Sequence, residues 1–223
     1  ATTLLTSHGA ARAVNMVIVD EALRGKGIGR RLMDLALAAA GEHDCRLCAT
    51  AEGLPLYRKL GFVEIGRVFQ HGGPAPAVAA PAGVEAASAD DLAAIVALDR
   101  EATGMDRSAM FAEIAAVGTF AVLRDGGRGR AFSVIRPFGR GEVIGPVVAP
   151  TLDEAERLVT HFVAMRTGAY VRVDTTDVSG LSPRLVAMGL PQVGGGVAMR
   201  LGGPPAPVAR SVTTHALASQ ALG

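Results

Sequence analysis

The chain has 223 residues, a formal net charge of +1 and 49% hydrophobic residues. This length suits one large or two small domains, and the apolar content is enough for a sizeable core. The nearly cancelled charge gives no indication of nucleic acid or an anionic membrane as a partner. The sequence shows neither an apolar run of the ~20 residues that span a membrane nor a signal peptide, so we expect a cytoplasmic protein.

The chain begins with a pattern typical of a β-hairpin. One strand is predicted over Thr2–Ser7, a turn over His8–Ala10 and a second strand over Ala13–Val19. The second strand leads into a run of glycine and basic residues. Its end is therefore the first candidate for a functional site.

That run reads Arg24-Gly-Lys-Gly-Ile-Gly-Arg30, and its three glycines alternate with residues whose side chains can point away. This spacing leaves backbone N–H groups free to converge on an anion. A helix is predicted next, because Ile28, Leu32, Leu35 and Ala39 fall on one helical face. The N-terminus of that helix and the basic side chains favour negative charge at the same point. The stretch therefore predicts a cradle for phosphate or pyrophosphate.

The glycine spacing separates this loop from two familiar phosphate-binding motifs. A P-loop needs Ser or Thr after its lysine, and none follows Lys26; a dinucleotide fingerprint would need glycine at position 30. The pattern resembles the acyl-CoA pyrophosphate loop of the GNAT (Gcn5-related N-acetyltransferase) superfamily, written [QR]xxGx[GA]. Arg24, Gly27 and Gly29 occupy its three defining positions.

A second motif follows at a fitting distance. The run Leu56–Phe62, with Tyr57 followed by Gly61-Phe62, resembles the Y-x-k-x-GF signature that ends the acetyl-CoA core of the same superfamily. Two motifs in the expected order make the resemblance specific. It covers residues 1–70 directly.

The two cysteines, Cys45 and Cys48, form a C-x-x-C pair inside a predicted strand. A zinc site would need two further ligands, and a redox pair should open a helix after a strand. Residues three apart in a strand face opposite sides. We therefore expect two reduced thiols that flank the core, and no metal.

The second half of the chain predicts a complete β-α-α-β-β-β-α-β-α-β order. Thr151 with Glu154 three residues later predicts a capping box at the start of a long helix. The strands of this half are predicted at residues 84–87, 119–123, 131–135, 143–148, 170–174 and 192–201, and its helices from 92, from about 108, at 152–165 and at 182–188. A further strand at residues 62–69 is predicted to end the first half.

This element order is the one that a GNAT module follows, so the resemblance implies two modules in tandem. It is similar to bacterial GNAT proteins that carry a divergent second domain. The expected fold class is α+β with a mixed α/β sheet, made of tandem GNAT-like acyl-CoA N-acyltransferase folds. Only about 14 residues precede the strand that leads to the loop. The first copy is therefore expected to lack its N-terminal strand and helices, and we favour the interpretation that the chain is a fragment.

Composition places the expected domain boundaries. Residues 1–70 form the acyl-CoA-binding core, and residues 71–83 form a semi-rigid linker rich in Pro, Ala and Gly. Residues 84–202 form the divergent GNAT-like domain. Residues 203–223, with three prolines near their start, are expected to be a poorly ordered tail.

The second copy has lost both chemical motifs. Its strand-to-helix junction lacks glycine, Pro150 removes an N–H donor, and Asp153 and Glu154 place negative charge in the first helical turn. Leu185 or Val186 stands where the first copy has tyrosine. We therefore predict that the second copy binds no CoA.

The resemblance implies roles for individual residues of the first copy. The strand backbone at Val17–Val19 would pair with the pantetheine arm, and an N–H there would polarise the thioester carbonyl. Tyr57 is the candidate acid for the leaving thiolate, since a phenol with an ordinary pKa of about 10 suits that proton transfer. The implied cofactor-binding residues are Val17, Ile18, Val19, Arg24, Gly25, Lys26, Gly27, Ile28, Gly29 and Arg30.

A polar cluster in the second copy is the candidate acceptor side. The substrate candidates are Asp99, Asp106, Arg107 and Asp174, with helix caps and surface ion pairs as the alternative interpretation. The general base stays unassigned. His8, a water chain ending on Asn15, a backbone carbonyl and the missing front of the first copy remain open.

The sequence therefore predicts an acyltransferase that moves an acetyl group from acetyl-CoA directly to an amine in a ternary complex. The acceptor would be a small molecule or an amino-acid-like compound, and a homodimer is left open. Two alternatives are a CoA-binding sensor without turnover, and a remnant first module joined to a ligand-binding second module. Neither nucleic acid nor a membrane is an expected partner.

Overall fold

The computed structural model describes residues 1–202 and 208–222, and these fall into two compact units. Unit 1 contains residues 1–67, 196–202 and 220–222, and unit 2 contains residues 68–195 and 208–219. Each unit is thus assembled from segments that are far apart in the sequence. Two strands, β4 (Phe62–Pro74) and β10 (Gln192–Leu201), begin in one unit and end in the other.

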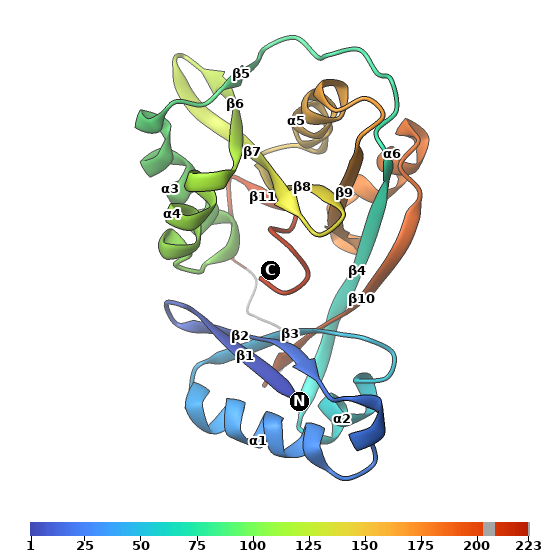
Figure 1. The fold of residues 1–223 in the computed structure, drawn as a ribbon. Helices are drawn as coiled ribbons and strands as arrows, with labels where there is room; N and C mark the ends of the chain where they lie inside the picture. The colour runs from blue at the N-terminus through green and yellow to red at the C-terminus, as the bar shows by residue number, and fades with distance from the viewer. Residues whose placement is uncertain (203–207, 223) are drawn as a thin grey trace. The chain divides into compact units, whose positions relative to one another are not determined.

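Unit 1 is a mixed sheet with the strand order β1-β2-β3-β10. The predicted hairpin is confirmed as β1 (Thr2–His8) and β2 (Ala11–Ile18), which are antiparallel. β3 (Asp44–Ala49) runs parallel to β2 and antiparallel to β10. Helix α1 (Ile28–Ala40) covers one face of β1 and β2 (Figure 1), and the short helix α2 (Leu54–Lys59) precedes β4.

The core of unit 1 lies between α1 and the sheet. Cys45, Leu47 and Ala49 alternate toward this core, whereas Cys48 lies on the opposite face of β3, as the strand period predicts. The face predicted for α1 is wrong by part of a turn, because Leu35 is 68% exposed. The buried stripe of α1 consists of Met33, Ala36 and Ala40. Small alanine side chains let the helix approach the sheet closely, and residue hydrophobicity alone does not reveal this.

Unit 2 is a larger mixed sheet with the strand order β4-β9-β11-β8-β7-β6-β5. Its pairings are antiparallel except for the parallel contact between β8 and β9. Its helices and strands are β5 (Val84–Ala86), α3 (Leu92–Thr103), α4 (Ser108–Val117), β6 (Thr119–Asp125), β7 (Arg128–Phe138), β8 (Gly141–Ala149), α5 (Leu152–Met165), β9 (Tyr170–Thr176), α6 (Leu181–Met188) and β11 (Thr213–Ala216).

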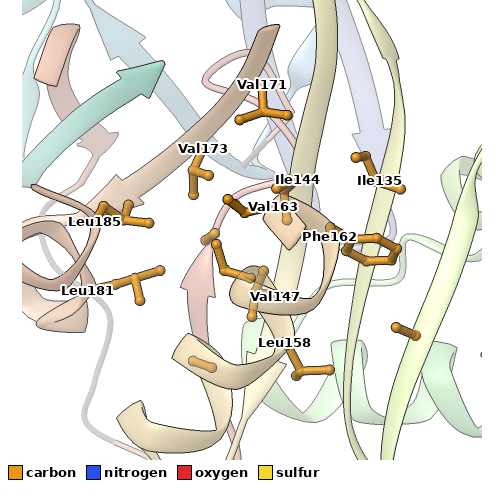
Figure 2. Packing of buried hydrophobic residues seen from close by; sticks show 14 of the residues in the cluster. Ile135, Ile144, Val147, Leu158, Phe162, Val163, Val171, Val173, Leu181 and Leu185 are labelled. Atoms are coloured by element: carbon orange, nitrogen blue, oxygen red, sulfur yellow. The ribbon is translucent and has the colours of Figure 1, made fainter. Parts of the chain in front are cut away.

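Helices cover both faces of this sheet. Figure 2 shows side chains of α5 and α6 meeting those of β7, β8 and β9 in one apolar core. The opposite face packs against α3 and α4 in a second cluster around Phe111 and Phe132, whose ring centroids lie 5.8 Å apart. Burying such side chains stabilises the fold by about 1.5–3 kcal/mol each.

The predicted linker at residues 71–83 is wrong in its first part. β4 continues to Pro74 and pairs with β9 from Val68 onward. His71 is fully buried and lies 2.9 Å from both the Leu190 carbonyl and the Ser182 hydroxyl. The later part of the segment also contacts unit 2, since the Arg157 guanidinium donates to the Ala82 carbonyl at 2.5 Å. The high Pro and Gly content therefore marks an irregular strand and a covering segment.

The predicted tail at residues 203–223 is wrong where the structure describes it. Its prolines at 204, 205 and 207 lie outside the described residues. Thr213–Ala216 form β11, which lies between β8 and β9. This strand is short and has no periodic apolar pattern that would predict it. Its pairing with the backbone of neighbouring strands holds it in place.

Candidate active site

The site in unit 1 begins with a bulge in β2. Thr2 pairs with Ile18 and Leu4 with Asn15, so β2 contains one more residue than β1 between these two pairs. Met16, inside the bulge, has a φ of 52°, an unusual conformation for a residue other than glycine. A bulge takes backbone groups out of the ladder and makes them available to a ligand.

β2 and β3 diverge beyond a short paired region. Residues 11–13 of β2 pair with residues 44–46 of β3, and residues 46–49 of β3 pair with β10 on the other edge of β3. We call the diverging stretch, residues 14–18 of β2 and 47–49 of β3, the β2–β3 fork. Within the described chain no other strand lies between these two strands. Val17 and Ile18, predicted to pair with a pantetheine arm, stand on the fork, and Val19 follows its end.

The glycine-rich loop connects the fork to α1. Gly25 and Gly27 have φ values of 74° and 75°, and a Cβ at either position would meet nothing within 4 Å. Glycine is therefore required there for backbone conformation rather than for packing. Gly29 is different, because a Cβ there would lie 3.4 Å from Leu56. The backbone of the loop at Gly25 and Gly27 is therefore unobstructed, whereas the first turn of α1 at Gly29 is packed against Leu56.

The start of α1 has no side chain that caps it. Its N-cap is Gly27, which offers no side-chain hydrogen bond, and its first turn has no acidic residue. The first backbone N–H groups of a helix lack intrahelical partners, and they point in the direction of the positive end of the dipole. Arg24 and Lys26 are exposed nearby in sequence. The Arg30 guanidinium forms an ion pair with Asp34 one turn further along the helix, at 2.8 Å. Arg30 would therefore contribute its backbone N–H, rather than its side chain, to an anion site.

The equivalent helix start in unit 2 is closed by its own residues. The Thr151 hydroxyl accepts a hydrogen bond from the Glu154 backbone N–H at 3.3 Å and donates to its carboxylate at 2.9 Å, which confirms the predicted cap. The Glu154 carboxylate also pairs with Arg130 at 2.6 Å. The first turn therefore carries acidic groups in place of an anion-binding surface.

Tyr57, the candidate acid, lies on α2 in the core of unit 1 and is 8% exposed. Its ring meets Phe62 edge-on at 6.2 Å, and Gly53 leaves room for it, since a Cβ there would lie 2.7 Å from the ring. Burial, followed by the nearby Cys48 thiol, raises the pKa of Tyr57 above its ordinary value of about 10. The phenol is therefore protonated at neutral pH. In unit 2, Leu185 is fully buried in apolar core and Val186 is exposed.

The raised pKa of Tyr57 sets the alkaline limit that its predicted role as the acid would have. An acid must be protonated to act, so its contribution to kcat falls as the pH rises through its pKa, and a raised pKa moves that fall to a higher pH. We expect the falling limb of kcat that belongs to Tyr57 to lie above about pH 10. A pH–rate profile of wild type and Tyr57→Phe checks this. A fall of kcat below pH 9 that occurs in wild type and is absent from Tyr57→Phe would contradict the raised pKa.

The four substrate candidates in unit 2 belong to three ion pairs. Asp99 and Arg107 are each 1% exposed and form a two-pronged pair at 2.9 and 2.5 Å. Asp106 is exposed; its hydrogen bonds to Ser108, then its pairing with Arg100, lower its pKa to about 2. Asp174 is buried against Arg172 on the same strand at 2.7 Å. These contacts favour the alternative interpretation of caps and ion pairs.

A segment that sequence reasoning missed lies against β2. The Asn15 side-chain N–H group donates to the Ala221 carbonyl at 3.1 Å and to the Thr6 hydroxyl at 3.0 Å. The side-chain amide oxygen of the neighbouring Gln220 accepts from the Cys48 thiol, at 3.8 Å from its sulfur. No local pattern could have identified this contact, because more than 200 residues of sequence separate its two partners. The base remains unassigned.

Two family comparisons agree with this geometry. A family model described as an acetyltransferase (GNAT) domain matches residues 95–212, more than half of the chain. A second model with the same description matches residues 2–64. The chain therefore belongs to the GNAT acetyltransferases, and the predicted fold class, a mixed α/β fold in two GNAT-like copies, is confirmed.

A curated relative is also described as an N-acetyltransferase. The chain is 30% identical over 190 residues to YitH of Bacillus subtilis (strain 168), an uncharacterized N-acetyltransferase. The match covers 81% of this chain and 66% of YitH, so the chain spans slightly under two thirds of that relative.

Solved structures share the fold. A provisionally assigned acetyltransferase from Pyrococcus horikoshii superposes with a TM-score of 0.82 at 19% identity, over 99% of this chain and 75% of that one. A GCN5-related N-acetyltransferase from Sphaerobacter thermophilus gives a TM-score of 0.61 at 17% identity, over 89% and 75% of the two chains.

Across residues 1–202 and 208–222, no helix is long and apolar enough to cross a bilayer. The same residues contain no group of three or more His, Cys, Asp or Glu side chains arranged to hold a metal ion.

Proposed function

We propose that the chain transfers the acetyl group of acetyl-CoA to the amine of a small-molecule or amino-acid-like acceptor. One arrangement carries the proposal: an uncapped, glycine-started helix adjoins a bulged strand that diverges from its neighbour, with a protonated tyrosine in the same unit. We assign the reaction to the first copy, residues 1–70. The donor and the acceptor are parts of the proposal that binding and turnover measurements must test.

The proposed binding mode uses the backbone of the loop and of the fork. The N–H groups at the start of α1 would hold the pyrophosphate, with Arg24 and Lys26 supplying positive charge. Residues 17–19 would hydrogen-bond the amide groups of the pantetheine arm, as an added strand would. This arrangement would bring the thioester to the bulge at Met16, where a freed backbone N–H can polarise its carbonyl.

The proposed chemistry is a direct transfer. The neutral amine nitrogen attacks the thioester carbonyl carbon and gives a tetrahedral intermediate whose oxyanion accepts backbone hydrogen bonds. The C–S bond then breaks, and Tyr57 donates its proton to the departing thiolate. The nitrogen loses its proton to a base that we leave unassigned. The products are an amide and free CoA thiol.

Turnover is tested by mixing the protein with acetyl-CoA and a panel of amines and following the release of free thiol. We expect thiol release that depends on one class of amine, with formation of the matching amide. Binding of CoA without thiol release from any amine would contradict the proposal and favour a sensor. Failure to bind CoA would contradict the site assignment as well.

The loop assignment predicts that Gly27→Asp weakens acetyl-CoA binding by about tenfold or more. Aspartate is a preferred N-cap, so its carboxylate would accept the helix N–H groups that the pyrophosphate needs and would repel the phosphates. Titration calorimetry measures the change. Gly126→Asp is the matched control, since Gly126 also has positive φ and open space around its Cβ position, but lies in a turn of unit 2. Unchanged affinity in Gly27→Asp would overturn the loop assignment.

A further inference from the structure

Unit 2 contains a fork like that of unit 1, but with a strand inside it. β8 carries one extra residue relative to β7 between the pairs Ser133–Val147 and Ile135–Ile144, which is a bulge like that of β2. β8 and β9 pair only at residues 142–143 and 171–172 and then diverge. We call residues 144–149 of β8 and 173–176 of β9 the β8–β9 fork. β11 lies inside this fork, between the two strands.

β11 makes strand contacts with both sides of the fork. It pairs antiparallel with β8 over Thr213–Ala216 and meets β9 where Ala216 faces Thr175. The Thr175 hydroxyl donates to the His215 carbonyl at 2.6 Å, and the Leu217 N–H donates to the Asp174 carbonyl at 2.7 Å. The segment is also buried, and less than a tenth of each residue is exposed at Val212, His215, Ala216, Ala218 and Ser219.

The fork itself is shaped for close backbone approach. A Cβ on Gly145, at the bulge of β8, would overlap the Leu217 carbonyl oxygen. Glycine at this position therefore lets the backbone of the C-terminal segment lie directly against the strand. A side chain of any size would exclude it.

Polar contacts fix the segment at both ends of β11. Upstream, the Glu101 carboxylate accepts hydrogen bonds from the Ser211 N–H and hydroxyl at 2.9 and 2.6 Å. Downstream, the buried Arg136 guanidinium donates to the Ala218 carbonyl at 2.7 Å. A buried cation that binds a backbone carbonyl recognises an extended chain by its main chain rather than by its side chains.

We propose that the β8–β9 fork is a peptide-binding site whose ligand is an extended strand, and that residues 208–219 are its resident ligand. The second copy thus receives a peptide strand at the position where the first copy is proposed to receive a pantetheine arm. Main-chain hydrogen bonds supply affinity, and the small side chains of Ala216 and Ala218 suit the narrow site. Strand binding is measured without acyl-CoA, so this proposal and the proposed function fail independently.

The test converts the covalent strand into a dissociable one. A specific-protease site replaces residues 203–207 in the full chain, and the protein is cleaved after it has folded. We expect the released C-terminal fragment to stay bound through gel filtration and to exchange with a fluorescent peptide of residues 208–219. A fragment that separates at once, together with a labelled peptide that does not bind, would overturn the proposal.

Two variants of the cleaved protein sharpen the result. Thr175→Val removes one hydrogen bond to the strand and should weaken peptide binding about tenfold; its control is Thr160→Val, whose hydroxyl bonds within α5 to the Glu156 carbonyl. Gly145→Ala should abolish peptide binding, while Gly129→Ala, in open space on β7, should leave it unchanged. Wild-type peptide affinity in both Thr175→Val and Gly145→Ala would place the peptide elsewhere and overturn the assignment.

Discussion

Replacing Tyr57 with phenylalanine is expected to lower kcat by about 10²–10⁴-fold and to leave acetyl-CoA affinity unchanged. The substitution removes only the hydroxyl, so the ring keeps its place against Phe62 and beside Gly53. The departing thiolate would then have to take its proton from water. Steady-state thiol release measures kcat, and titration calorimetry measures CoA binding on the same preparation.

The chain contains two tyrosines, which supplies a matched control. Tyr170 lies in unit 2, where Arg140 stacks on its ring at 5.2 Å, and Tyr170→Phe should retain wild-type turnover. Unchanged turnover in Tyr57→Phe would reject the acid role. A parallel loss of CoA binding would show that the hydroxyl positions the donor instead.

Where local pattern decides structure, the sequence was sufficient. The helix predicted at residues 152–165 and the strand predicted at 192–201 are found with the same bounds as α5 and β10. A capping threonine with Glu154 marks the start of α5, and its apolar stripe has the helical period. The strand-to-helix connection at Arg24–Gly29 was also identifiable, since glycine at alternate positions favours neither a strand nor a helix.

Long-range pairing was beyond local pattern. β11 and the second half of β4 are defined by partners far away in the sequence, and His71 is buried because Leu190 and Ser182 meet it. A short strand inside a fork is held by backbone hydrogen bonds, which every residue can accept and every residue but proline can donate. Its sequence therefore did not distinguish it from a disordered tail.

The prediction that Asp99 and Arg107 lie on the acceptor side did not anticipate that both residues are buried. Asp99 and Arg107 are charged residues around a turn, and such a pattern is equally typical of a binding cluster and of a solvated helix end. Burial is decided by the neighbouring apolar residues of α4, such as Phe111 and Ile114, once they pack on the sheet. The distinction matters because a buried ion pair and a substrate site respond differently to substitution.

The buried pair predicts a large loss of stability on removing one partner. Asp99→Ala removes the carboxylate that pairs with the Arg107 guanidinium at a position where both residues are only 1% exposed. Its expected cost is about 3–5 kcal/mol in the free energy of unfolding, measured by urea denaturation. The double variant Asp99→Leu/Arg107→Met should recover most of that loss, since apolar replacement of a buried pair is often close to neutral.

The exposed pair on the same helix end is the matched control and completes the distinction. Asp106→Asn alters a solvated pair with Arg100 and should leave stability nearly unchanged, because surface ion pairs contribute little. If Asp99 has a structural role, the folded fraction of each variant keeps the wild-type KM for the acceptor. A raised acceptor KM in Asp99→Ala at unchanged stability would instead restore Asp99 to the substrate site. The double variant, whose stability is restored, separates the two interpretations. If Asp99 is structural, that variant binds the acceptor normally; if Asp99 binds substrate, that variant is stable but binds the acceptor poorly.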